Sequence, residues 1–210
     1  MVARLQIVQW ATVASDSPAR FPGRPRDAAL DVAILSAAAR HLGERGFAGM
    51  SMEGVAAAAG TTAPSLRRRF RGKLELAVAG IDAMPAEPLP GATGQPRADA
   101  LAILENLRAN LVRRNGMAIF GTVLAEERRN PELLDHFRQR LEEPRRERLR
   151  QALARGAETG HLPVGLDLDA AVSLLIGSLY ACYLRTRCIP GDWAERTLGM
   201  IWPMGQVMIG

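Results

Sequence analysis

The chain has few cysteines, few aromatic residues and a single lysine, Lys73. Its two cysteines, Cys182 and Cys188, cannot build the disulfide framework of a small secreted domain. We interpret them as small apolar residues near a helix end, with a redox pair as the open alternative. The sequence also lacks a continuous apolar run of about 18 residues and the layout of a signal peptide, so we expect a cytoplasmic protein with no membrane partner.

Sequence signals for catalysis are missing as well. His41, His136 and His161 are scattered, and none has a neighbour at metal-ligand spacing. There is no nucleophile elbow and no phosphate-binding glycine loop. We therefore expect no metal, no cofactor and no enzymatic activity.

Positive charge is concentrated in the first third of the chain. The whole sequence has 27 Lys and Arg against 22 Asp and Glu, a net charge of +5. Residues 20–73 alone hold ten basic and four acidic residues, so their excess of six exceeds that of the whole chain. This asymmetry is typical of a polyanion-binding module attached to a neutral body.

Helical periodicity starts after an N-terminal segment without any. Residues 1–23 have no clear period, and we expect a mobile extension. Apolar residues then recur at every fourth position, at Leu30, Ile34, Ala38 and Leu42. This spacing predicts a helix over 27–45 that ends at Gly46, with Phe47 folding back onto its apolar face.

Two short helices separated by a tight turn are predicted next. Ser51 is placed to cap a helix over 52–59, and Thr62 to cap another that runs to about residue 70. Gly60 lies in the turn, and Val55 and Leu66 can pack between the helices. This is the anatomy of a helix-turn-helix over 51–70, whose second helix fits the major groove of DNA. A fourth helix is expected over 73–84.

The second of these helices carries polar and basic residues suited to DNA. Thr61, Thr62 and Ser65 lie at its start, where side chains reach base edges. Leu66 and Phe70 mark its buried face, so Arg67 and Arg68 are better candidates for DNA contact than Arg69. A solvated arginine cluster on a helical bundle is the alternative that these residues leave open.

A run of prolines and glycines between residues 85 and 96 predicts the main domain boundary. Beyond it, helices are expected over 97–115, 117–130, 131–160, 167–188 and from about 192 to 209, with Pro144 kinking or interrupting the third of them. No strand-like alternation persists. The sequence therefore predicts an all-α fold, with a three-helix helix-turn-helix domain over 24–84 and a larger C-terminal helical domain over 97–210.

Residues 24–80 resemble the DNA-binding domain of TetR-type (tetracycline-repressor-like) regulators. The resemblance rests on ILSAAARHLGERGFAGMSMEGVAAAAG at 34–60, LRRRF at 66–70 and Lys73 just after. It implies that Ser51 and Lys73 contact phosphates and that Thr61, Thr62 and Ser65 lie at the groove. It also implies that Arg24 and Arg26, in the run GRPR, form a basic arm that can enter the minor groove.

Two residues depart from the family pattern. Ala63 stands where the family commonly has lysine, and Arg67 where it has tyrosine. These changes alter the part of the second helix that contacts DNA, so an operator sequence known for the family cannot be assigned to this chain. They also keep open a second function, that of a helical ligand-binding or interaction protein whose helix-turn-helix no longer binds DNA.

The C-terminal half resembles the family more loosely, from Glu126 to Arg187. The resemblance implies a homodimer formed through the last two long helices, and a small-molecule effector of unknown identity bound among residues 97–188. The candidate dimer interface on the first of these helices consists of Leu174, Gly177, Ser178 and Ala181. The candidate effector pocket consists of Met117, Phe120, Leu124, Phe137, Tyr180 and Tyr183. The expected function is that of a dimeric, ligand-responsive regulator, a repressor of an operator in double-stranded DNA.

Overall fold

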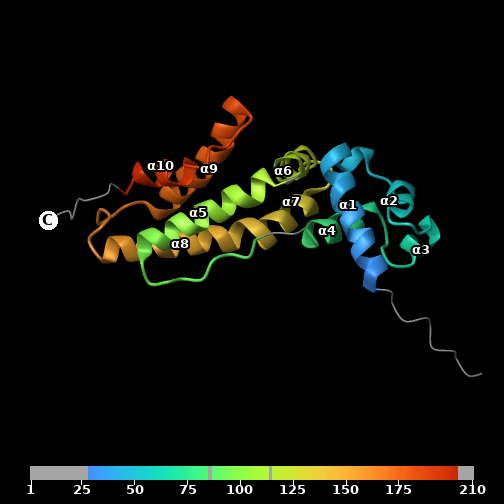
Figure 1. Cartoon of the computed structure of the whole chain (residues 1–210), viewed down its shortest axis with the longest axis horizontal. Coiled ribbons are helices and arrows are strands. Elements are labelled where there is room, and N and C mark those ends of the chain that lie inside the picture. The colour runs from blue at the N-terminus through green and yellow to red at the C-terminus, as the bar shows by residue number, and fades with distance from the viewer. Residues whose placement is uncertain (1–27, 85–86, 114, 203–210) are drawn as a thin grey trace, which may run out of the picture.

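The computed structural model describes residues 28–84, 87–113 and 115–202, and within these ranges every regular element is a helix (Figure 1). The predicted all-α fold is confirmed. The expected mobile extension over 1–23 and the basic arm of Arg24 and Arg26 lie outside the described residues.

Four helices form the N-terminal bundle. They are α1 (Ala28–Gly49), α2 (Met52–Ala58), α3 (Ala63–Arg67) and α4 (Lys73–Asp82). Gly46 has a φ of 69° and breaks α1, as the predicted C-cap glycine should, and Phe47 beyond it is buried. The third helix is shorter than expected. It ends at Arg67, and a turn at 68–69 follows before Phe70.

The core of this bundle follows the predicted pattern. Ile34 and Leu42 of α1, Val55 of α2 and Leu66 of α3 are all fully buried in one apolar cluster. Burial of each such side chain contributes about 2 kcal/mol, so these contacts hold the two short helices at a set angle. Of the alanines that end α2, only Ala56 is buried, while Ala57 and Ala58 face solvent.

The larger C-terminal part contains seven more helical elements. They are α5 (Pro96–Val112), α6 (Gly116–Ala125), α7 (Pro131–Phe137), the π-helix η1 (Arg138–Glu142), α8 (Glu143–Glu158), α9 (Leu168–Thr186) and α10 (Trp193–Gly199). The expected interruption of 131–160 is the π-helix itself. Pro144 follows as the second residue of α8, and because α8 continues directly from η1, its missing amide hydrogen removes a hydrogen bond from a continuous helical stretch.

Helices α5 and α8 lie side by side along the length of the molecule (Figure 1). The linker over 87–95 runs beside them to the far end, so that α5 returns towards the N-terminal bundle. Asp99 fastens this end, because its buried carboxylate accepts hydrogen bonds from the amide of Thr93 (2.8 Å), the hydroxyl of Thr93 (2.6 Å) and Arg155 of α8 (3.1 Å).

Helices α6 and α7 join the two parts. Val123 of α6 and Phe137 of α7 are buried in the same apolar cluster as Leu42 of α1. At the start of α6, Asn115 has a φ of 72°, and its side chain lies so close to Gly43 of α1 that an added Cβ would be 2.5 Å from Asn115 Cβ. The N-terminal bundle therefore packs directly against the C-terminal helices through α6 and α7.

The last helix is shorter than the sequence predicts. Helix α10 ends at Gly199, and the turn after it places buried Trp202 against Gly156 of α8, where there is no room for a Cβ. A proline follows Trp202 in the sequence, and a residue before proline is disfavoured in the helical conformation. Residues 203–210 lie outside the described ranges.

Candidate nucleic-acid interface

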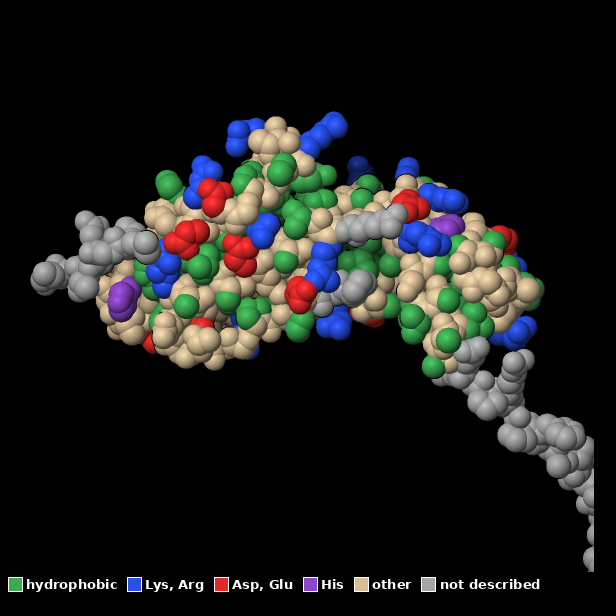
Figure 2. Space-filling view, viewed as in Figure 1, with side chains coloured by type: hydrophobic (Ala, Val, Ile, Leu, Met, Phe, Trp, Pro, Cys, Tyr) green, Lys and Arg blue, Asp and Glu red, His purple; other side chains and the backbone are tan. Residues whose placement is uncertain are grey.

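Helices α2 and α3 and the turn between them form a helix-turn-helix at one end of the molecule (Figure 1). Gly60, with a φ of 69°, makes the turn, and the amide of Thr61 donates to the carbonyl of Ala56 (2.9 Å). On the outer side of α3, Thr62, Arg67 and Arg68 are exposed. Arginine and lysine side chains are visible on this end of the molecule in Figure 2.

Both predicted capping residues cap their helices. Ser51 Oγ accepts from the amide of Gly54 (3.1 Å), and Thr62 Oγ1 accepts from the amide of Ser65 (3.4 Å). Capping uses each hydroxyl as an acceptor and leaves its hydrogen able to donate. The two side chains can therefore hold the helix starts and donate to a phosphate or base acceptor at the same time.

The two candidate arginines differ in whether an acidic side chain balances their charge. Arg67 Nη2 forms an ion pair with Oε1 of Glu53, the first acidic residue of α2. Arg68 is exposed and forms no ion pair with any described residue. Arg68 therefore presents its full charge to solvent, whereas the charge of Arg67 is partly balanced by Glu53.

The remaining arginines of this segment stabilise the bundle. Arg69 pairs with Asp31 of α1, and the amide of Arg71 donates to the carboxylate of Glu75 (2.6 Å). The sequence suggested that Arg69 points away from DNA because it lies beside the buried face. Its partner Asp31 is 38 residues away in the chain, so helical spacing alone could not identify the pair.

Lys73 begins α4 and lies against the end of α1. Its Nζ is 3.5 Å from the carbonyl oxygen of Ala48 and 4.4 Å from the centroid of the Phe47 ring. A cation over an aromatic face is attracted by the ring quadrupole. The lysine is thus held at the edge of the helix-turn-helix, beside the positive N-terminus of α4.

The six residues suggested as an effector pocket do not form one cavity. Phe120 of α6 stacks on Tyr180 of α9 with ring centroids 4.4 Å apart and lies 5.8 Å from Phe137. Met117 and Tyr183 line a separate groove of about 370 Å³. Leu124 is 45% exposed on α6.

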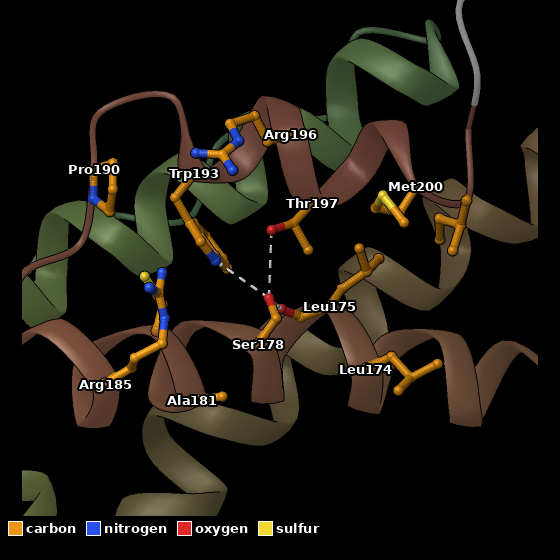
Figure 3. Close-up of a pocket in the computed structure, with 12 residues that line it drawn as sticks. Leu174, Leu175, Ser178, Ala181, Arg185, Pro190, Trp193, Arg196, Thr197 and Met200 are labelled. Carbon is orange, nitrogen blue, oxygen red and sulfur yellow. Dashed lines mark hydrogen bonds between the residues drawn. The ribbon is translucent and has the colours of Figure 1, made fainter.

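The suggested dimer face lies beside a groove between α9 and α10, of about 610 Å³ (Figure 3). Leu174 is 68% exposed, Ala181 is exposed, and a Cβ added at Gly177 would meet nothing within 4 Å. Ser178 instead bonds within the chain, accepting from the indole of Trp193 (3.2 Å) and lying 3.5 Å from Thr197 Oγ1. By length and composition α9 could cross a membrane, and 28% of its apolar window is buried.

The chain is all-α and carries a capped, basic helix-turn-helix beside a larger helical part. This architecture is typical of DNA-binding regulators. Residues 34–79 match the family described as bacterial regulatory proteins of the tetR family, and residues 90–201 match the tetracyclin repressor-like C-terminal domain. The chain therefore belongs to the TetR family of transcriptional regulators.

Relatives and solved structures agree with this assignment. The chain is 28% identical over 179 residues to the uncharacterized HTH-type transcriptional regulator YdeS of Bacillus subtilis (strain 168), covering 85% of this chain and 90% of YdeS. Its fold is similar to that of MexZ of Pseudomonas aeruginosa, with a TM-score of 0.65, 23% identity, and coverage of 86% of this chain and 98% of MexZ.

Proposed function

We propose that this regulator is a homodimeric, ligand-responsive transcriptional repressor that works in the cytoplasm on a palindromic operator. The observation that carries the proposal is the outer side of α3, where Thr62, Arg67 and Arg68 are exposed on a helix of set orientation. Thr61, Thr62 and Ser65 would face base edges, while Ser51, Arg67, Arg68 and Lys73 would contact phosphates.

A second copy of the chain is the partner that best explains the exposed side of α9. Leu174, Gly177, Ala181 and Leu184 follow helical spacing and are exposed or face open space. Met200 beyond α10 is 84% exposed beside them. Small residues between large apolar ones allow two helices to approach closely, so the face suits a helix pair from the partner better than it suits a bilayer.

Dimerisation would also set the geometry of DNA binding. Two copies related by a twofold axis would present two α3 helices to successive major grooves, about 34–36 Å apart. An effector that binds one arrangement of the dimer more tightly would shift the population and change operator affinity by the same differential free energy. MexZ is described as a repressor, and occupancy of promoter DNA by a dimer gives repression without further machinery. We propose no catalytic step.

DNA binding can be tested directly with the purified full-length chain. A fluorescently labelled duplex from the intergenic region upstream of its own gene is titrated at about 50 and 150 mM salt. We expect tight binding whose affinity falls roughly 400-fold over this range, because about six phosphate contacts release counterions. Absence of affinity for the duplex at low salt would support the alternative, a helical ligand-binding protein whose helix-turn-helix no longer binds DNA.

A further inference from the structure

Arg145 is an unusual residue for the interior of this protein. It lies on α8, is only 6% exposed, and donates from Nη1 to the carbonyl of Leu141 (3.1 Å). Its Nε is buried and has no hydrogen-bond partner among the described residues. A buried guanidinium donor left without a partner is costly, so its environment is incomplete without an acceptor.

The neighbouring carboxylate does not supply that acceptor. Glu142 Oε2 forms an ion pair with Arg145 Nη1 at 3.7 Å, which is too far for a hydrogen bond, and this oxygen has no hydrogen-bond partner among the described residues. Burial raises the pKa of Glu142 and lowers the pKa of Arg145, with each partner opposing the shift in the other. Glu142 ends the π-helix η1, and such wide turns frequently occur at functional sites.

Arg145 separates two cavities. On one side is a small space of about 40 Å³, with Arg145, Asn110 and Tyr180 as its polar residues and apolar walls that include Leu107 and Phe137. On the other is a cleft of about 420 Å³ between α4, the 87–95 linker, α5 and η1. Met84, Asn110, Leu141 and Arg145 line both, so the two spaces adjoin at the Arg145 side chain.

The two acids that line the cleft do not pair with Arg145, whose ion-pair partner is Glu142. Among the described residues no acid lines the smaller space, and Glu142 lines neither space. The two acids of the cleft already have partners. Asp82 pairs with His136 (2.8 Å) and Arg140 (3.4 Å), and Glu87 pairs with Arg113.

We propose that the effector is a small amphipathic carboxylic acid whose carboxylate binds Arg145 and whose apolar body lies between Met84, Leu89 and Leu141. A guanidinium binds a carboxylate through two parallel N–H donors, which satisfies the orphaned Nε. The volume of the cleft is within the range of pockets for small molecules. This proposal rests on the proposed function, in which a ligand changes DNA binding, and it names the chemical class of that ligand.

The site is placed to affect the helix-turn-helix. Met84 lies two residues beyond the end of α4, the helix that begins at Lys73, and Ile81 and Asp82 of α4 also line the cleft. An occupant would therefore touch the end of α4 on one side and α5 and α8 on the other. Binding to one position of α4 in preference to another would couple the site to DNA affinity.

The test uses the full-length protein with octanoate as the probe and octanamide as its uncharged match. Binding is measured by titration calorimetry and by the shift in Tm. We expect octanoate at saturating concentration to raise Tm by roughly 5 °C and octanamide to have little effect. Octyl phosphate is a third arm, and we expect it to bind more weakly because one buried guanidinium suits a single charge.

Arg145→Met and Arg146→Met are the matched variants. Both arginines lie within ion-pair distance of Glu142, but only Arg145 lines the cavities. We expect Arg145→Met to weaken octanoate binding at least tenfold and Arg146→Met to leave it unchanged. Arg145→Lys, which keeps the charge but not the paired donors, should also lose affinity and covers the case in which the methionine variant fails to fold.

Three results would overturn the proposal: equal binding of octanoate and octanamide, unchanged octanoate affinity in Arg145→Met, or absence of binding to the wild type by octanoate and by shorter and longer carboxylates. DNA binding by each folded variant is measured separately. If the wild type does not bind DNA, the proposed function is contradicted, but the calorimetric result on Arg145 can still be interpreted.

Discussion

Arg67 and Glu53 form an ion pair that joins the two helices of the helix-turn-helix, from the last residue of α3 to the first turn of α2. Both side chains are more than half exposed, at 58% and 62%. An exposed pair of this kind contributes little to stability, between about 0 and 1 kcal/mol. Arg67 can therefore leave Glu53 for a DNA phosphate at small cost.

Replacing Glu53 with glutamine should strengthen DNA binding. The change removes a negative charge from the DNA-facing side and leaves Arg67 unpaired. One unit charge close to a phosphate in water is worth about 1 kcal/mol, and a dimer carries the change twice, so we expect affinity to rise roughly thirtyfold at low salt. The measurement is a fluorescence anisotropy titration with the upstream duplex. Glu75→Gln, in the first turn of α4, is the control for a general effect of net charge.

Arg68→Ala should weaken DNA binding at every sequence. Because Arg68 is exposed and has no ion pair among the described residues, its loss removes one phosphate contact per subunit without disturbing the fold. In a dimer the slope of log affinity against log salt should flatten by about 1.8, twice the contribution of one contact. Arg150→Ala, on α8 at the opposite end, should leave the slope unchanged. An identical slope in both variants would exclude Arg68 from the phosphate contacts. The same measurement on Arg67→Ala tests whether Arg67 leaves Glu53 on binding.

Leu174→Arg should convert the dimer to a monomer. The side chain is 68% exposed on the side of α9 where we place the partner, and a charge buried there would have no counterion. Size-exclusion chromatography with light scattering gives the mass directly. Val164→Arg is the matched control, because Val164 is 94% exposed in the loop before α9. A dimer that survives Leu174→Arg would place the interface elsewhere.

Asp99 should make stability depend on pH below neutrality. Burial alone would raise its pKa, but hydrogen bonds from Thr93 and the backbone of Gly94 and the charge of Arg155 outweigh it and lower the pKa below 3.8. A carboxyl with a lowered folded pKa adds stability above pH about 4 and loses it as pH falls through the folded pKa.

Asp99→Asn should therefore lower the free energy of unfolding at pH 7 by about 2 kcal/mol, since it removes charge-assisted hydrogen bonds. Urea denaturation at pH 7, 5 and 3 measures the effect, and the difference from wild type should shrink at pH 3. Asp135→Asn, an exposed carboxylate 4.0 Å from Arg138, should change little at any pH. A constant difference across the range would contradict the account of Asp99.

Local sequence signals predicted the helices that depend on local chemistry. Ser51 and Thr62 were identified as caps because a hydroxyl before an apolar helix start can accept free amides, and both do so. The predicted ends of α3 and α10 were too late. For α10, the turn beyond the helix end places Trp202 against Gly156 of α8, a contact that helical spacing does not indicate.

In the candidate site, too, some features depend on local sequence and others on tertiary contacts. The identity of the helix-turn-helix follows from periodicity, glycines and caps, which are properties of neighbours within four residues. The pairing of Arg67 with Glu53, 14 residues away, could not be predicted, because any exposed acid could have competed for it. Arg145 gave no signal either, since helical spacing does not indicate that a charged residue will be buried beside a cavity.

The sequence by itself determined that this protein is all-helical and carries a basic helix-turn-helix, because those features are encoded by side chains a few positions apart. The tertiary structure decided which arginines keep their charge available and which are paired. It also decided that α4, α5 and α8 meet around a buried guanidinium. Such outcomes depend on which distant residues packing brings together, and burial then alters the free energy of every charge among them.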